Sequence, residues 1–275
     1  MEAEMSEHHC HWLFGYGSIV NEESRLRTLA AHSQDAPPPA AWVELSSGAG
    51  FVREWNFRAP SGFQAVGLRR VPEDASAIGG VLFEAGGDDA LRSFDLREAG
   101  YERVELDPSL ITVIDEQARV EQGAVTTSAI LGREQQQQQE EEEQQQQQPP
   151  QERHRRYRCR NRFWTYVPVE TSCASEDNPI CQTYIDTCLL GCLERGKSAG
   201  EGRDLAVRWL LTTGSWSRFL LNDAPMSRRP WLHRPRHAEI DAICREHEAH
   251  TLFDERRHPE EFSGRWMGSL RGVLP

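Results

Sequence analysis

The stretch Trp12-Leu13-Phe14-Gly15-Tyr16-Gly17-Ser18 is an apolar run that ends in turn residues. Such a run is typical of a buried strand. Two glycines on either side of a tyrosine let the main chain turn sharply and bring its N–H groups close to a ligand. The stretch therefore predicts a strand and a turn able to hold a carboxylate or a developing oxyanion. Taken alone, the pattern also fits an ordinary strand-to-turn junction.

Outward from this stretch, the first half of the chain alternates strand patterns with turns. Further strands are expected at Trp42–Leu45, Phe51–Phe57, Ala65–Val71, Ile78–Phe83, Tyr101–Leu106, Leu110–Ile114 and Phe163–Val169. One helix is expected after Asn21, a good N-cap residue, and another between Gly86 and Gly100.

The second half of the chain is predicted to be helical. Apolar residues recur at helical spacing in a helix opened by Pro179 and closed near Gly196, then in Arg203–Leu211 and in His237–His247. Several strands with one inserted helix, followed by packed helices, indicate an α+β fold.

The segment Arg97-Glu98-Ala99-Gly100-Tyr101 places an acid at a helix end just before a strand. If Glu98 faced a cleft, partial burial would raise its pKa from about 4.3 toward the ~6–7 suited to general acid/base work. The alternative is a surface glutamate paired with a neighbouring arginine, because exposed glutamate is common.

The FGYGS turn, the Arg-Glu-x-Gly-Tyr helix end, the later Thr165-Tyr166 strand and the Pro-started helix together resemble the γ-glutamylcyclotransferase-like superfamily. This group includes the γ-glutamylcyclotransferases, the ChaC-type enzymes and the AIG2-like proteins. The resemblance spans Trp12–Gly196. It implies a small mixed β-barrel with an inserted helix, to which this chain adds a C-terminal helical extension.

The resemblance also implies roles for individual residues. Glu98 matches the catalytic acid/base of the family. The residues that match the substrate-binding loop and a later pocket tyrosine are Gly15, Tyr16, Gly17, Ser18, Ile19 and Tyr166. Ile19 stands where cyclotransferases proper tend to have Asn and ChaC-type members an apolar residue, so the substrate within the superfamily stays open.

The implied reaction is release of 5-oxoproline from a small γ-glutamyl substrate, without cofactor or metal. The alternative is a non-catalytic AIG2-like module for ligand binding or interaction, and the acid at Glu98 favours the enzyme. A third reading is the same reaction on a larger substrate of a biosynthetic pathway.

The 275 residues carry a formal net charge of −12 and a mean hydropathy of −0.66. Much of this polarity comes from residues 134–152, which hold eleven Gln, six Glu and two Pro and nothing else. We expect a disordered insert at 133–153, because such a tract cannot bury enough apolar area to offset its ordering entropy. The acidic balance argues against nucleic-acid binding, and the Arg-rich segment Arg153–Arg162 is interpreted as a solvated strand.

No apolar run approaches the length of a membrane span, and the first residues lack a secretory signal pattern. The seven cysteines are odd in number and form no C-x-x-C, which predicts reduced thiols in a cytoplasmic protein. A metal site at His8-His9-Cys10-His11 is disfavoured for want of a second ligand pair. The expected organisation is a flexible start at 1–11, one domain at 12–196 and a helical extension at 197–275, with no prediction of oligomeric state.

Overall fold

The computed structural model describes residues 8–29, 39–71, 73, 75–114, 159–223, 236–258 and 261. The Gln/Glu tract at 133–153 lies outside the described residues, so the disordered insert expected there stays a prediction.

A mixed sheet of six strands carries the segments that the sequence predicted most clearly. Its strands, in the order β6-β8-β1-β5-β2-β7, are Tyr101–Glu105, Cys159–Pro168, His8–Gly15, Ile78–Gly86, Ala41–Leu45 and Ile111–Val113. Strand β1 runs parallel to β8 and antiparallel to β5. Consecutive residues of β5 from Ile78 to Phe83 are buried, so both faces of the strand are covered, which explains why its sequence there does not alternate with polar residues.

A second sheet of five strands packs beside the first. In the order β10-β3-β4-β9-β11, its strands are Thr213–Gly214, Phe51–Arg58, Gln64–Arg70, Ile180–Cys181 and Leu220–Leu221. One face of β3 is buried through Phe51, Arg53 and Trp55, and a β-bulge between Trp55 and Phe57 then interrupts the alternation.

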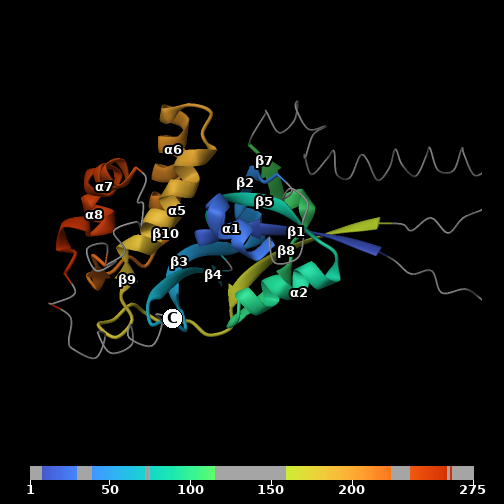
Figure 1. Cartoon of the computed structure of the whole chain (residues 1–275), viewed down its shortest axis with the longest axis horizontal. Coiled ribbons are helices and arrows are strands. Elements are labelled where there is room, and N and C mark those ends of the chain that lie inside the picture. Colours follow the sequence, from blue (N-terminus) through green and yellow to red (C-terminus); the bar gives the residue numbers. More distant parts are fainter. Residues whose placement is uncertain are drawn as a thin grey trace, which may run out of the picture.

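The helices divide between two places (Figure 1). Helix α2 (Asp88–Arg97) lies near β8 and β1, and α1 (Glu22–Leu29) follows the first turn. At the other end of the molecule lie α5 (Gln182–Arg195), α6 (Ala199–Leu211), α7 (His237–Glu246) and α8 (Glu248–Thr251). The side chain of Asn21 caps α1 by accepting from the main-chain N–H of Ser24 at 3.0 Å, as its sequence position predicted.

The mixed α+β class is confirmed, whereas the closed barrel is not. Among the described residues, strand hydrogen bonds form two sheets with open edges instead of one ring. The helix expected to open at Pro179 begins at Gln182, because the two residues before it pair with β4 and β11 and form β9.

Two expectations for the start of the chain are corrected. Strand β1 already begins at His8, because residues 8–13 pair in parallel with β8. Cys10 is disulfide-bonded, so the prediction of reduced thiols was wrong for this residue. The free cysteines that the structure describes are Cys173, which is exposed, and Cys181, Cys188, Cys192 and Cys244, which are buried.

One buried cluster joins the sheets to the C-terminal helices. It contains Leu13 and Phe83 of the first sheet, Trp55 of the second, Trp209 of α6 and Ile240 of α7. Residues after 196 thus contribute strands β10 and β11 and core side chains as well as helices. No helix in the described part of the chain has the length and apolar character needed to cross a membrane.

Candidate functional site

The turn after β1 is compact because the chain folds back on itself at a glycine. Residues Ser18–Val20 form a single 3-10 turn directly after Gly17. A Cβ atom added at Gly15 would lie 2.1 Å from Cγ2 of Ile19, far inside van der Waals contact. Glycine at position 15 is therefore required by the close approach of Ile19.

Two buried side chains hold this turn from the core side. Nε1 of Trp209 donates to the main-chain carbonyl of Tyr16 at 2.9 Å, and Nη1 of Arg53 donates to the same oxygen at 3.4 Å. Arg53 also donates to the carbonyls of Gly79 and Trp209 at 2.9 and 2.7 Å. Burial lowers the pKa of Arg53 to about 10, with buried cysteine and tyrosine neighbours acting in the opposite direction. The main chain at Tyr16 is thus fixed by donors from β3 and α6.

Glu98 lies at the C-terminal end of α2, where its N–H still bonds to the carbonyl of Phe94 at 2.8 Å. Gly100 has a φ of 96°, in the left-handed region that favours glycine, and it turns the chain into β6. The Glu98 side chain is 22% exposed and pairs with Nε of Arg97 at 3.1 Å. Burial raises the pKa of Glu98, and the Arg97 charge offsets part of that rise. Each sequence interpretation of Glu98 is therefore met in part. The side chain forms an ion pair with Arg97, and it also lines a cavity.

A small cavity brings every predicted site residue together. It is lined by Leu13, Phe14, Gly15, Tyr16, Gly17, Ser18, Ile19, Val66, Glu98, Tyr101, Tyr166 and Tyr184, and its volume is about 40 Å³. Segments from β1, β4, β6, β8, α5 and the end of α2 thus meet at one point. The catalytic and binding roles of these residues stay predictions.

A larger cavity of about 510 Å³ lies elsewhere, against β3 and residues 171–174 and 215–217. Its acid, Glu54, is held in two contacts by Arg69 at 2.7 and 2.8 Å. None of the predicted site residues lines it. The smaller cavity is therefore the candidate active site.

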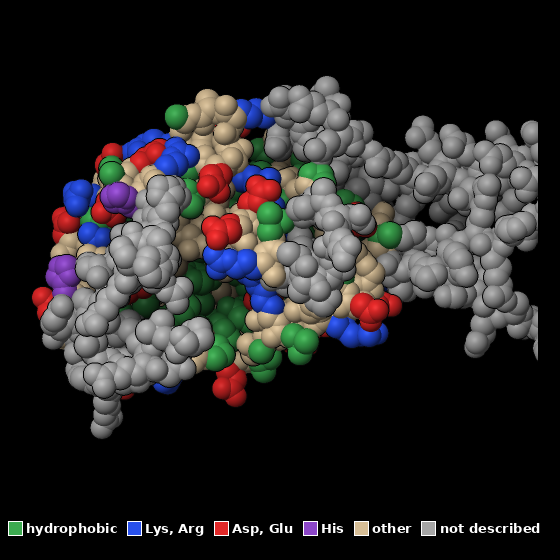
Figure 2. Space-filling view, in the orientation of Figure 1, with side chains coloured by type: hydrophobic (Ala, Val, Ile, Leu, Met, Phe, Trp, Pro, Cys, Tyr) green, Lys and Arg blue, Asp and Glu red, His purple; other side chains and the backbone are tan. Residues whose placement is uncertain are grey.

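Figure 2 shows hydrophobic side chains gathered in the lower middle of the described surface, with acidic and basic side chains beside one another above them.

Three tyrosines of the cavity donate hydrogen bonds from their hydroxyl groups to other protein atoms. Tyr16 donates to the carbonyl of Tyr166 at 2.6 Å, Tyr101 to the carbonyl of Val66 at 3.0 Å, and Tyr166 to Oδ1 of Asp95 at 2.9 Å. Burial raises the pKa of all three phenols, so they stay protonated. These hydroxyls hold the walls of the cavity in place.

The sequence did not single out Tyr184, Tyr101 or Val66 as site residues. Tyr184 lies on the first turn of α5, and its side chain lines the same cavity as Ser18. Burial is the main cause of the raised pKa of Tyr184. Tyr101 belonged to the quoted Glu98 motif and could have been included, whereas nothing in the local pattern around Tyr184 or Val66 marks them.

The described residues contain no group of three or more His, Cys, Asp or Glu side chains placed to hold a metal ion. The ring of His11, from the His/Cys cluster, is buried and has protein partners on both sides. Its Nε2 lies 2.8 Å from Oδ1 of Asp88, and its Nδ1 accepts from Nε1 of Trp164 at 3.0 Å.

No family model and no curated protein matches this sequence. Similar solved structures include a gamma-glutamyl cyclotransferase, with a TM-score of 0.41 and 13% identity over 71% of this chain and 86% of that one. A gamma-glutamyl cyclotransferase from yeast that is specific to glutathione has a TM-score of 0.37 and 12% identity over 90% of this chain and 98% of that one. YkqA from Bacillus subtilis has a TM-score of 0.39 and 15% identity over 73% of this chain and 54% of that one. Two of the three carry the name of the superfamily that the motifs resemble, and at these values the likeness by itself assigns no activity to this chain.

Proposed function

We propose that this protein is a γ-glutamyl cyclotransferase that releases 5-oxoproline from a small γ-glutamyl substrate. The observation that carries the proposal is the position of Glu98, a carboxyl group of raised pKa, in the same small cavity as the glycine-bracketed turn at residues 15–19. A pocket that only bound a ligand would have no need of a half-buried acid there.

The reaction suits a site of this size because both reacting groups belong to one molecule. The α-amine of the γ-glutamyl group attacks its own γ-carbonyl, so a C–N bond forms within a five-membered ring and the original amide C–N bond breaks. Holding the substrate in the folded conformation supplies much of the rate, since well-oriented intramolecular reactions reach effective molarities on the order of 10⁵ M or more. The rigid tyrosine walls of the cavity provide this kind of positioning.

Glu98 performs both proton transfers in the proposed mechanism. As a carboxylate it takes a proton from the α-ammonium group, and as a carboxylic acid it then gives that proton to the departing amine. A raised pKa brings the carboxyl group closer to the working pH, where both forms are accessible. The Arg97 contact limits the rise and keeps the carboxylate populated.

The negative charge that develops on the γ-carbonyl oxygen needs a donor. The main-chain N–H groups of the turn at residues 15–18 are the donors expected from the sequence, and one well-placed donor is worth about 3 kcal/mol. We add the hydroxyl of Tyr184, which lines the same cavity and keeps its own proton because burial raises its pKa. Only a compact group fits a cavity of this size, so in the proposed complex the γ-glutamyl end enters and the remainder of the substrate lies toward solvent.

Incubation with glutathione and with a panel of γ-glutamyl amino acids and amines, followed by mass detection of 5-oxoproline, tests the proposal. Release of 5-oxoproline from at least one of them is expected. The alternative, a non-catalytic ligand-binding module, predicts that a γ-glutamyl compound binds by calorimetry and is recovered intact.

A further inference from the structure

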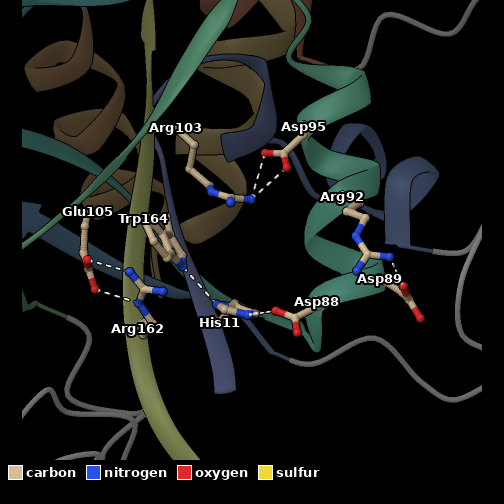
Figure 3. A network of polar contacts seen from close by, with 9 residues as sticks. All are labelled: His11, Asp88, Asp89, Arg92, Asp95, Arg103, Glu105, Arg162 and Trp164. Atoms are coloured by element: carbon tan, nitrogen blue, oxygen red, sulfur yellow. Dashed lines mark hydrogen bonds and ion pairs between the residues drawn. The ribbon is translucent and has the colours of Figure 1, made fainter. Parts of the chain in front are cut away.

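The acid in the candidate site is placed by the end of α2, and the contacts of α2 with the first sheet decide where that end lies. Figure 3 shows acidic side chains of α2 in contact with residues of that sheet. At the start of the helix, Asp88 contacts His11 of β1 at 2.8 Å. In its last turn, Asp95 contacts Arg103 of β6.

Asp95 binds a pair of residues on two neighbouring strands. Arg103 of β6 and Tyr166 of β8 lie directly opposite each other in the antiparallel register. Oδ1 of Asp95 accepts from the Tyr166 hydroxyl at 2.9 Å and from Nη1 of Arg103 at 3.0 Å, and Oδ2 accepts from the same Nη1 at 2.8 Å. One carboxylate therefore fixes the helix against two strands at once.

These contacts surround Glu98. Asp95 precedes it by three residues, one helical turn, so both side chains project from neighbouring points of the same helix face. Arg103 comes after Glu98 in the chain, beyond the connection at residues 98–100 that joins α2 to β6. The Asp95–Arg103 pair thus closes the loop that contains Glu98, and the Asp95–Tyr166 bond ties the same carboxylate to a residue that lines the cavity.

We infer that Asp95 is a positioning residue, which holds the acid Glu98 and the cavity wall at Tyr166 in fixed relation to each other. The effect of Asp95 on catalysis rests on the proposed function. Its effect on the position of Glu98 and Tyr166 rests only on the contacts described above.

Removal of the Asp95 carboxylate is expected to have different effects on folding stability and on the rate of catalysis. The side chains of Arg103 and Asp95 are 30% and 40% exposed, and ion pairs in such settings contribute about 0–1 kcal/mol to folding. A shift of about 1 Å in a reacting group costs up to ~10²-fold in rate. Loss of Asp95 should therefore affect catalysis more than folding.

Asp89 offers a matched control on the same helix. It pairs with Arg92 of α2 at 2.6 Å, and its side chain is 91% exposed. Figure 3 shows this pair directed away from the sheet. The variants D95A and D89A both remove one carboxylate from α2, but only the first removes contacts with β6 and β8.

The test compares wild type, D95A, D95N and D89A. We expect D95A to lower kcat about tenfold, with a smaller change in KM, as misplacement of a reacting group predicts. D95N should recover part of this loss because its amide oxygen still accepts from Tyr166, and D89A should match wild type. A D95A enzyme with unchanged kcat, or with the same loss as D89A, overturns the inference.

A second readout does not depend on activity. The amides of Glu98 and Tyr101 bond to the carbonyls of Phe94 and Glu98 at 2.8 and 2.9 Å. Hydrogen exchange at these two amides should be faster in D95A than in D89A. If wild type releases no 5-oxoproline, the proposed function fails while this comparison still decides the role of Asp95, and equal exchange in the two variants contradicts it.

Discussion

The hydroxyl of Tyr16 donates a 2.6 Å hydrogen bond to the main-chain carbonyl of Tyr166, and both residues are buried. Tyr16 belongs to the turn after β1, and Tyr166 lies on the neighbouring parallel strand β8. Since both residues line the cavity, this bond sets the distance between its floor and one wall. The candidate site is therefore assembled by contacts between segments far apart in the sequence.

Replacement of Tyr16 by Phe should lower the free energy of unfolding by about 1 kcal/mol or somewhat more, because the buried carbonyl of Tyr166 loses its donor. Urea denaturation measures the change. The control is Y101F, which removes the 3.0 Å bond to Val66 at a half-buried residue and should cost less. Equal losses in the two variants would show that burial of the donor tyrosine is not decisive.

Replacement of Trp209 by Phe keeps an aromatic ring in the core but removes the donor to the Tyr16 carbonyl. We expect a loss of about 1 kcal/mol in stability and reduced turnover, because the turn loses one of its two supports. Trp216 provides the comparison, since its buried Nε1 has no hydrogen-bond partner among the residues that the structure describes. W216F should cost less than W209F in chemical denaturation, and the reverse order would contradict the role given to Trp209.

Replacement of Gly15 by Ala should destabilise the fold by about 1–3 kcal/mol, the usual cost of overpacking a filled site. The reason is the 2.1 Å approach of the new Cβ to Ile19. Gly87 is the matched control, because a Cβ there meets nothing within 4 Å. Thermal melting of G15A and G87A checks the difference, and a G15A melting temperature equal to that of G87A would be evidence against the close-approach argument.

Stability should depend on pH through Glu98. Burial raises its pKa in the folded state, so the folded state favours the protonated carboxyl. The resulting contribution to stability is fully present below the unfolded pKa and is lost as pH rises through the folded pKa. The variant E98Q has no such group. Its stability relative to wild type should therefore increase as the pH rises above the ordinary pKa of a glutamate, about 4.3, as measured by urea unfolding at each pH. A constant difference would mean that burial does not perturb this carboxyl.

The sequence predicted the parts of the fold that depend on local signals. Apolar runs marked β5 and β8, Asn21 marked the start of α1, and Gly100 marked the chain reversal after α2. The FGYGS turn and the Glu98 motif each have a clear local pattern. Their meeting in one cavity could be expected only from the family resemblance, because neither pattern specifies which strands pair.

The features that the sequence missed depend on partners distant in the chain. Strands β9, β10 and β11 have two residues each, too few for any alternation to appear. They form because β10 pairs with β3, β9 pairs with β4 and β11 pairs with β9. Cys10 gave no sign of its disulfide bond, since the number and spacing of the cysteines indicated free thiols. Tyr184 joins the site only because α5 packs against the turn at Ser18.

The most direct test of the account is the rate of 5-oxoproline release by wild type and by E98Q on the same γ-glutamyl substrate. The amide keeps the shape of the carboxyl group but cannot take and return a proton. We predict that E98Q folds and binds the substrate, while its rate falls by ~10²–10⁴-fold, the usual contribution of a general acid/base. A folded E98Q that releases 5-oxoproline at the wild-type rate would contradict the role of Glu98.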